Sequence, residues 1–129
     1  MKRYQFDSDV IIWHLRGNGQ IRNYLETLPE IFISIITIGE VYQGVRNKIE
    51  LQVAKRFVSK SIAYPVNSAI SFQAINLIEK YTLSNGLLTM DAVIAATALE
   101  TNRILVTGNI KHFKVIRGLK VVDWRDLIN

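Results

Sequence analysis

Six residues of this chain have side chains suited to metal chemistry and stand just after predicted strands or at the starts of predicted helices. Four are among the 11 acidic residues of the sequence, and the other two are a threonine and an asparagine: Asp7, Asp9, Glu40, Asp91, Thr107 and Asn109. Carboxylate and amide oxygens are hard ligands, which suit Mg²⁺ or Mn²⁺ better than zinc. If the fold brings these residues together, they predict a site for a divalent cation.

The elements that must position them are short apolar runs alternating with longer helical patterns. We expect strands at 3–6, 31–36, 62–66, 103–107 and 120–123, and helices at 7–17, 19–28, 37–47, 49–60, 68–83 and 90–99. This alternation is typical of a three-layer α/β/α sandwich with a mainly parallel sheet of four to five strands. Such sheets bind ligands at the carboxyl ends of their strands, where the acids are expected to meet.

The segment MDAVIAATAL at 90–99 shows why one of the acids needs an explanation. A helix that is apolar all round is a buried helix, and this one begins with a carboxylate. Asp91, Ala95 and Ala98 share one face of the helix. The sequence therefore predicts a helix packed closely on the sheet, with Asp91 at the tip that faces the cation site.

Each polar residue also has a purely structural interpretation. Ser8 or Asp9 could cap a helix, and Thr37–Glu40 matches a capping box. The charge of Asp91 suits the first turn of a helix because of the helix dipole, and Thr107–Asn109 could form an ordinary turn. Capping explains one acid at a time, however, whereas converging buried carboxylates repel one another unless a cation offsets their charge. His14 and His112 lack partners at zinc-ligand spacing and are interpreted as surface or helix-end residues.

The composition restricts the class of protein. The 129 residues are 49% hydrophobic and contain no cysteine, which excludes disulfides and thiolate chemistry and fits a cytoplasmic protein of one domain over 1–129. The longest apolar stretch, at 31–39, is too short to cross a membrane. A net charge of +5 favours an anionic partner such as nucleic acid, although a merely solubilising surface explains it equally well.

Four segments resemble the PIN-domain family, and more narrowly the VapC-type toxin ribonucleases. They occur in the family's order and cover nearly the whole chain: FDSDVIIWHLRG at 6–17, SIITIGEVYQG at 34–44, LLTMDAVIAATAL at 87–99 and ILVTGNIKHFKVIRGLKVVDW at 104–124. The resemblance implies a compact α/β/α fold and an endoribonuclease that uses Mg²⁺ or Mn²⁺ to hydrolyse RNA phosphodiester bonds.

The resemblance also assigns roles to residues. It implies catalytic roles for Asp7, Glu40, Asp91 and Thr107, with the metal held by Asp7, Asp91 and Asn109. Glu40 is either a further ligand or a general base acting through water, and Asp9 matches a supporting position. Two residues depart from the family pattern. Gly108 replaces a frequent arginine that could contact phosphate, and Asn109 replaces an acid that would bind metal more strongly.

The implied partners are RNA, with transfer RNA as one candidate, a VapB-type antitoxin and a second copy of the chain in a homodimer; no membrane is implied. Two basic clusters are candidates for RNA contacts, or are simply solvated: Arg46, Lys48, Lys55, Arg56 and Lys60, and then Lys111, Lys114 and Arg117. Three alternatives stay open. They are a non-catalytic RNA-binding or protein-interaction module with a degenerate site, a receiver-like phosphoryl-transfer domain, and a DNA nuclease of a related PIN branch.

Overall fold

The computed structural model describes residues 2–128, so Met1 and Asn129, the ends of the predicted single domain, lie outside the described residues. The strands are β1 (Tyr4–Phe6), β2 (Phe32–Ser34), β3 (Ile62–Tyr64), β4 (Ile104–Thr107) and β5 (Val121–Asp123). The helices are α1 (Ser8–Leu15), α2 (Gly19–Glu26), α3 (Ile35–Gln43), α4 (Lys48–Ser59), α5 (Ser68–Asn85), α6 (Thr89–Glu100), α7 (Ile110–Phe113) and α8 (Trp124–Leu127). That residues 1–129 form one domain stays a prediction.

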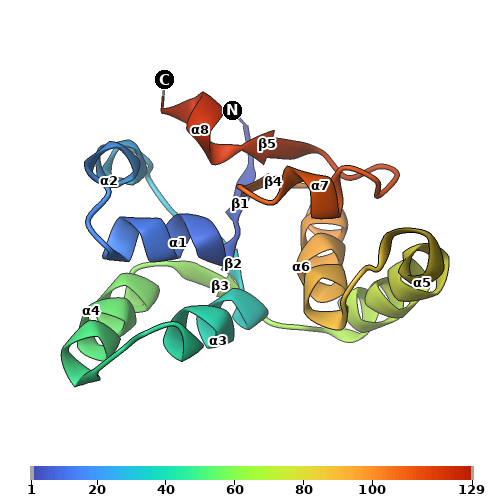
Figure 1. The fold of residues 1–129 in the computed structure, drawn as a ribbon, viewed down its shortest axis with the longest axis horizontal. Helices are drawn as coiled ribbons and strands as arrows, with labels where there is room; N and C mark the ends of the chain where they lie inside the picture. The colour runs from blue at the N-terminus through green and yellow to red at the C-terminus, as the bar shows by residue number, and fades with distance from the viewer. Residues whose placement is uncertain (1, 129) are drawn as a thin grey trace.

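The strands pair in parallel, as predicted. One set of hydrogen-bonded strands has the order β1-β4-β5, β2 pairs with β3, and β1 lies against β2. Helices α1, α2 and α4 lie on one side of the strands and α5 and α6 on the other (Figure 1). The α/β fold with a parallel sheet is therefore confirmed. Within residues 2–128, no helix is both long and apolar enough to cross a membrane.

Most elements begin and end within two residues of their predicted limits, but α3 spans residues 35–43 instead of 37–47. Strand β2 ends at Ser34, and α3 begins at Ile35 instead of residue 37, because the Ser34 hydroxyl accepts a hydrogen bond from the Ile36 N–H at 3.1 Å. This side-chain cap starts the helix inside an apolar run that resembles a continuous strand. The two short helices α7 and α8 were not predicted.

Helix α6 is buried on nearly all sides, as its apolar sequence predicts. Ala92, Ala95 and Ala98 are fully buried, and α5 packs against the helix along its length. Strand β1 is tied to the same helix by a buried hydrogen bond from Gln5 Nε2 to the Ile94 carbonyl oxygen, 3.0 Å long. Small side chains thus allow α6 to approach the strands closely, which places Asp91 near the carboxyl end of β1.

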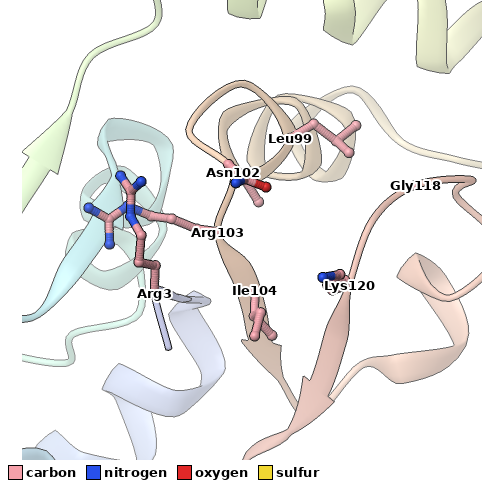
Figure 2. A pocket seen from close by; sticks show the side chains of 8 residues that line it. Arg3, Leu99, Asn102, Arg103, Ile104, Gly118 and Lys120 are labelled. Atoms are coloured by element: carbon pink, nitrogen blue, oxygen red, sulfur yellow. The ribbon is translucent and has the colours of Figure 1, made fainter. Parts of the chain in front are cut away.

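The amino ends of the strands carry a basic pocket of about 250 Å³ (Figure 2). Its lining includes Arg3, Asn102, Arg103 and Lys120, and burial together with the charge of Arg3 lowers the pKa of Arg103. Arg103 is held in place by stacking on the Phe32 ring, 3.6 Å from the ring centroid. These cations lie at the opposite end of β1 and β4 from Asp7 and Thr107, so they offer controls for charge changes near the candidate site.

Candidate active site

The centre of the candidate site is a buried carboxylate at the end of β1. Asp7 is 3% exposed and also caps α1, because its Oδ1 accepts a hydrogen bond from the Ser8 N–H at 2.8 Å. Its Oδ2 accepts a hydrogen bond from the Thr107 hydroxyl, also at 2.8 Å. The parallel register of β1 and β4 pairs Phe6 with Val106. The residues that follow them, Asp7 and Thr107, therefore lie together at the same edge of the sheet.

The turn after β4 is built around two of the predicted residues. The Thr107 hydroxyl oxygen accepts a hydrogen bond from the Asn109 N–H at 3.0 Å, and the Gly108 N–H donates to Asp9 Oδ2 at 2.7 Å. Asp9 also accepts from the Val10 N–H at 2.9 Å. Asp9 therefore holds the turn in place, which agrees with a supporting role. The Asn109 side chain makes no capping hydrogen bond to α7.

Glu40 and Asp91 approach from the two helices that flank this edge. Glu40 lies in α3 and Asp91 in the first turn of α6, and the two helices are in contact. Thr37 is buried inside α3, whose cap is Ser34, so the capping-box interpretation of Thr37–Glu40 is wrong. Glu40 Oε1 is buried, and within residues 2–128 it has no hydrogen-bond partner. A buried acceptor of this kind needs a donor or a cation.

The electrostatics of the site favour a positive ion. Burial, with the charges of Asp9 and Glu40, raises the pKa of Asp7 to about 7, although the hydrogen bonds from Thr107 and Ser8 act to lower it. Burial is also the main cause of the raised pKa values of Asp9 and Glu40, and the Asp91 charge adds to the shift of Glu40. Bringing these carboxyl groups together is therefore costly unless a proton or a cation neutralises them.

The donor set fits Mg²⁺ or Mn²⁺. Carboxylate, amide and hydroxyl oxygens are available from Asp7, Glu40, Asp91, Asn109 and Thr107. Within residues 2–128, no three acid, histidine or cysteine side chains are close enough together to enclose an ion by themselves. Mg²⁺ usually binds one or two carboxylates directly and keeps several of its waters.

One neighbour of the site was not predicted. His112 is a surface residue in the last turn of α7, as predicted, but its Nδ1 also lies 3.5 Å from Asp91 Oδ2. It is exposed, but it faces a site acid. The sequence pattern does not indicate α7, the four-residue helix that turns His112 toward α6. His14 lies in the last turn of α1 against Phe57, as expected of a helix-end residue.

Comparisons with known proteins agree with the motifs and the geometry. The family model for the PIN domain matches residues 4–119. Ribonuclease VapC10 of Mycobacterium tuberculosis is 30% identical over 118 residues, which cover 88% of this chain and 88% of that protein.

Solved structures show the same likeness. A toxin–antitoxin complex from Klebsiella pneumoniae contains a similar chain, with 29% identity and a TM-score of 0.78 over 93% of this chain and 96% of that one. VapBC2 from Rickettsia felis, bound to a promoter DNA fragment, contains another, with 27% identity and a TM-score of 0.80 over 94% and 98%. The resemblance inferred from the four segments is confirmed.

The raised pKa of Asp7 predicts how stability depends on pH when no metal is bound. The folded state holds a proton on Asp7 up to about pH 7, whereas the unfolded chain loses it near 3.8, so stability should fall as pH rises between these values. At about 1.4 kcal/mol per pKa unit, the Asp7 contribution is at most about 4 kcal/mol. Urea unfolding in EDTA across this range should show the fall, and Asp7→Asn should remove much of it. The control is the same change at an exposed acid, Asp126→Asn, which should leave the dependence of stability on pH unchanged. If Asp7→Asn also left that dependence unchanged, Asp7 would not be its cause.

Gly108 predicts a second measurable effect. A Cβ at this position would lie 2.5 Å from Asp9 Oδ2 and 2.9 Å from Trp124 Nε1, so Gly108→Ala should destabilise the protein by about 1–3 kcal/mol through overpacking. The control is Gly39→Ala within α3, where a Cβ meets nothing within 4 Å. Because alanine favours helix over glycine, this change should stabilise the protein by about 0.5–1 kcal/mol. Thermal unfolding of both variants checks the contrast, and equal shifts in Tm would show that Asp9 and Trp124 do not restrict position 108.

Proposed function

Because this chain belongs to the PIN-domain family, among its VapC-type members, we propose that it is a metal-dependent endoribonuclease and the toxin of a VapBC-type toxin–antitoxin pair. The observation that carries the proposal is the buried Asp7 carboxylate, held by Thr107 at the edge that Glu40 and Asp91 also approach. A carboxylate that only capped a helix would not need to be buried beside other acids.

We assign the roles of the residues from their positions. Asp7 and Asp91 are the primary ligands for Mg²⁺ or Mn²⁺, and Asn109 contributes its amide oxygen. A bound ion would supply charge neutralisation and a water of lowered pKa at neutral pH. Thr107 keeps Asp7 in one orientation by donating its hydroxyl hydrogen to Oδ2.

Glu40 is the residue best placed to handle a proton. It is half-buried, its Oε1 is without a partner within residues 2–128, and its pKa is raised mainly by burial. A carboxylate with a raised pKa is a better base toward water. We propose that Glu40 either accepts a proton from the attacking water or completes the metal site. Attack by water leaves a 5′-phosphate and a 3′-hydroxyl, so cyclic phosphate products would count against this route.

The basic residues after β4 are the better candidates for RNA contacts. Lys111 and Lys114 are exposed and share a groove with Gly108 and Asn109. Within residues 2–128, no member of the other basic cluster lines this groove. Phosphate contacts of this type give affinity without sequence choice, and transfer RNA is our proposed test substrate.

An antitoxin partner follows from the similar complexes. The chain from Klebsiella pneumoniae occurs in a toxin–antitoxin complex and the chain from Rickettsia felis in VapBC2, so we propose a VapB-type antitoxin for this protein. The homodimer is proposed from the resemblance to the family. A cytoplasmic location belongs to the same proposal, because the substrate is RNA. The alternative is a non-catalytic RNA-binding module, which the replacement of an acid by Asn109 favours.

Cleavage of a labelled transfer RNA tests the proposal. We expect the purified protein to cut the RNA in Mg²⁺ or Mn²⁺, with no cutting in EDTA. Asp7→Asn and Asp91→Asn should each lower the rate by at least about 100-fold, since losing an electrostatic group in an active site costs that much or more. Circular dichroism should show that both variants fold.

The matched control is Glu100→Gln, which removes an exposed acid at the far end of α6 and should leave cleavage unchanged. A matched DNA of the same sequence separates a ribonuclease from a DNA nuclease. RNA binding without cleavage by the folded protein would favour the non-catalytic module.

Charge reversal at Lys111 and Lys114 tests the RNA contact. At about 0.7 per phosphate contact on a single strand, the double variant should reduce the salt dependence of binding (the slope of log K against log salt) by about 1.4 and weaken binding at low salt. The control reverses Lys2 and Lys120, which are exposed at the opposite end of the strands. Equal losses in both variants would show that only net charge matters.

A further inference from the structure

An open groove of about 710 Å³ borders the turn after β4. Among residues 2–128, its lining includes Gly108 and Asn109 from that turn but not Asp7, Glu40 or Asp91. The charged residues of the groove are the cations Lys111, Lys114 and Arg125 and the acids Asp123 and Asp126, which give it a net charge of +1. The groove is therefore a basic extension of the candidate active site, reached directly from Asn109.

Among residues 2–128, Arg125 makes more side-chain hydrogen bonds than the other cations of this groove. Its Nε donates to Asp123 Oδ1 at 2.8 Å and its Nη2 to Asp123 Oδ2 at 2.7 Å, while its backbone N–H is capped by the same carboxylate at 3.0 Å. This two-pronged pairing fixes the plane of the guanidinium, as a single contact would not. Nη2 also lies 3.5 Å from the Gly108 carbonyl oxygen, which places the guanidinium beside the turn of the candidate site.

Gly108 explains why Arg125 can lie there. A Cβ on residue 108 would be 2.9 Å from Trp124 Nε1, so the indole packs directly against the backbone of the turn. Trp124 also packs against the apolar cluster on the α1 side of the strands. The next residue, Arg125, is therefore fixed at the rim of the site. Because Gly108 has no Cβ, α8 can pack against the turn and place the Arg125 side chain beside it.

We propose that Arg125 binds an RNA phosphate adjacent to the scissile one and so positions the strand along this groove. The inference rests on the proposed ribonuclease function and names a substrate contact for that same site. The pair with Asp123 uses Nε and Nη2, which leaves the Nη1 amino group for a phosphate oxygen. The family match ends at residue 119, so Arg125 is a contact that the match itself does not assign.

Steady-state cleavage of a labelled transfer RNA measures this contact. Arg125→Gln should raise KM by about tenfold with little change in kcat, which corresponds to one lost hydrogen bond to a charged group. The salt dependence of RNA binding (again the slope of log K against log salt) should fall by about 0.7. Arg125→Lys should recover part of the lost affinity, because it keeps the charge without the planar fork. Lys120→Gln, which removes an exposed cation at the opposite end of the sheet, should keep the wild-type KM.

The double variant Asp123→Asn with Arg125→Gln separates a phosphate contact from simple charge pairing. It has the net charge of the wild type and keeps a helix-capping residue at position 123. A KM as high as that of Arg125→Gln supports the proposal. A KM restored to the wild-type value overturns it, because Arg125 would then only neutralise Asp123; so does a wild-type KM in Arg125→Gln alone.

Binding of the same RNA in EDTA, followed by fluorescence anisotropy, keeps the two proposals distinguishable. If the wild type does not cleave but Arg125→Gln binds RNA about tenfold more weakly than wild type, the ribonuclease proposal fails and the phosphate contact stands. If the wild type cleaves and the variant matches it in both assays, the phosphate contact fails and the ribonuclease proposal stands.

Discussion

The burial of the Asp7 carboxylate beside Thr107 is the constraint on which the rest of the site depends. The parallel register of β1 and β4 brings these two residues to one edge, where the hydroxyl donates to Oδ2 at 2.8 Å. Burial raises the pKa of Asp7 to about 7, so at neutral pH the carboxyl group is close to the point where a proton and a metal ion compete for it. A divalent cation bound here would offset the free-energy cost of burying the charged Asp7 carboxylate.

Small residues around the site allow the neighbouring helices to pack closely against it. Alanines at the buried positions of α6 let the helix lie close to the strands, and the bond from Gln5 to the Ile94 carbonyl ties it to β1. Asp91 lies in the first turn of this helix, where its charge acts on Glu40. On the other side of the turn, Gly108 lets Trp124 pack against the backbone, which brings α8 to the rim of the site. Close backbone approach, made possible by small residues, thus builds both the acidic centre and the basic groove.

The sequence predicts most of this arrangement because its main signals are local. Apolar runs identify the strands, and the polar residues that follow them identify the edge of the sheet. Four features of the structure have no clear signal in the sequence pattern. The Ser34 cap is hidden inside an apolar run, the four-residue helices α7 and α8 are too short to show a helical period, and the contact of His112 with Asp91 depends on α7. The contact of Trp124 with Gly108 joins residues that no local pattern connects.

The most direct measurement is the number of protons released when Mg²⁺ or Mn²⁺ binds at about pH 7, obtained by calorimetry in buffers of different ionisation enthalpy. With a pKa of about 7, Asp7 is about half protonated before binding, so we expect about half a proton from this residue for each ion bound. The Asp7→Asn variant should bind more weakly and release fewer protons. Tight binding with equal proton release in both proteins would contradict the central claim that the buried Asp7 is the primary ligand.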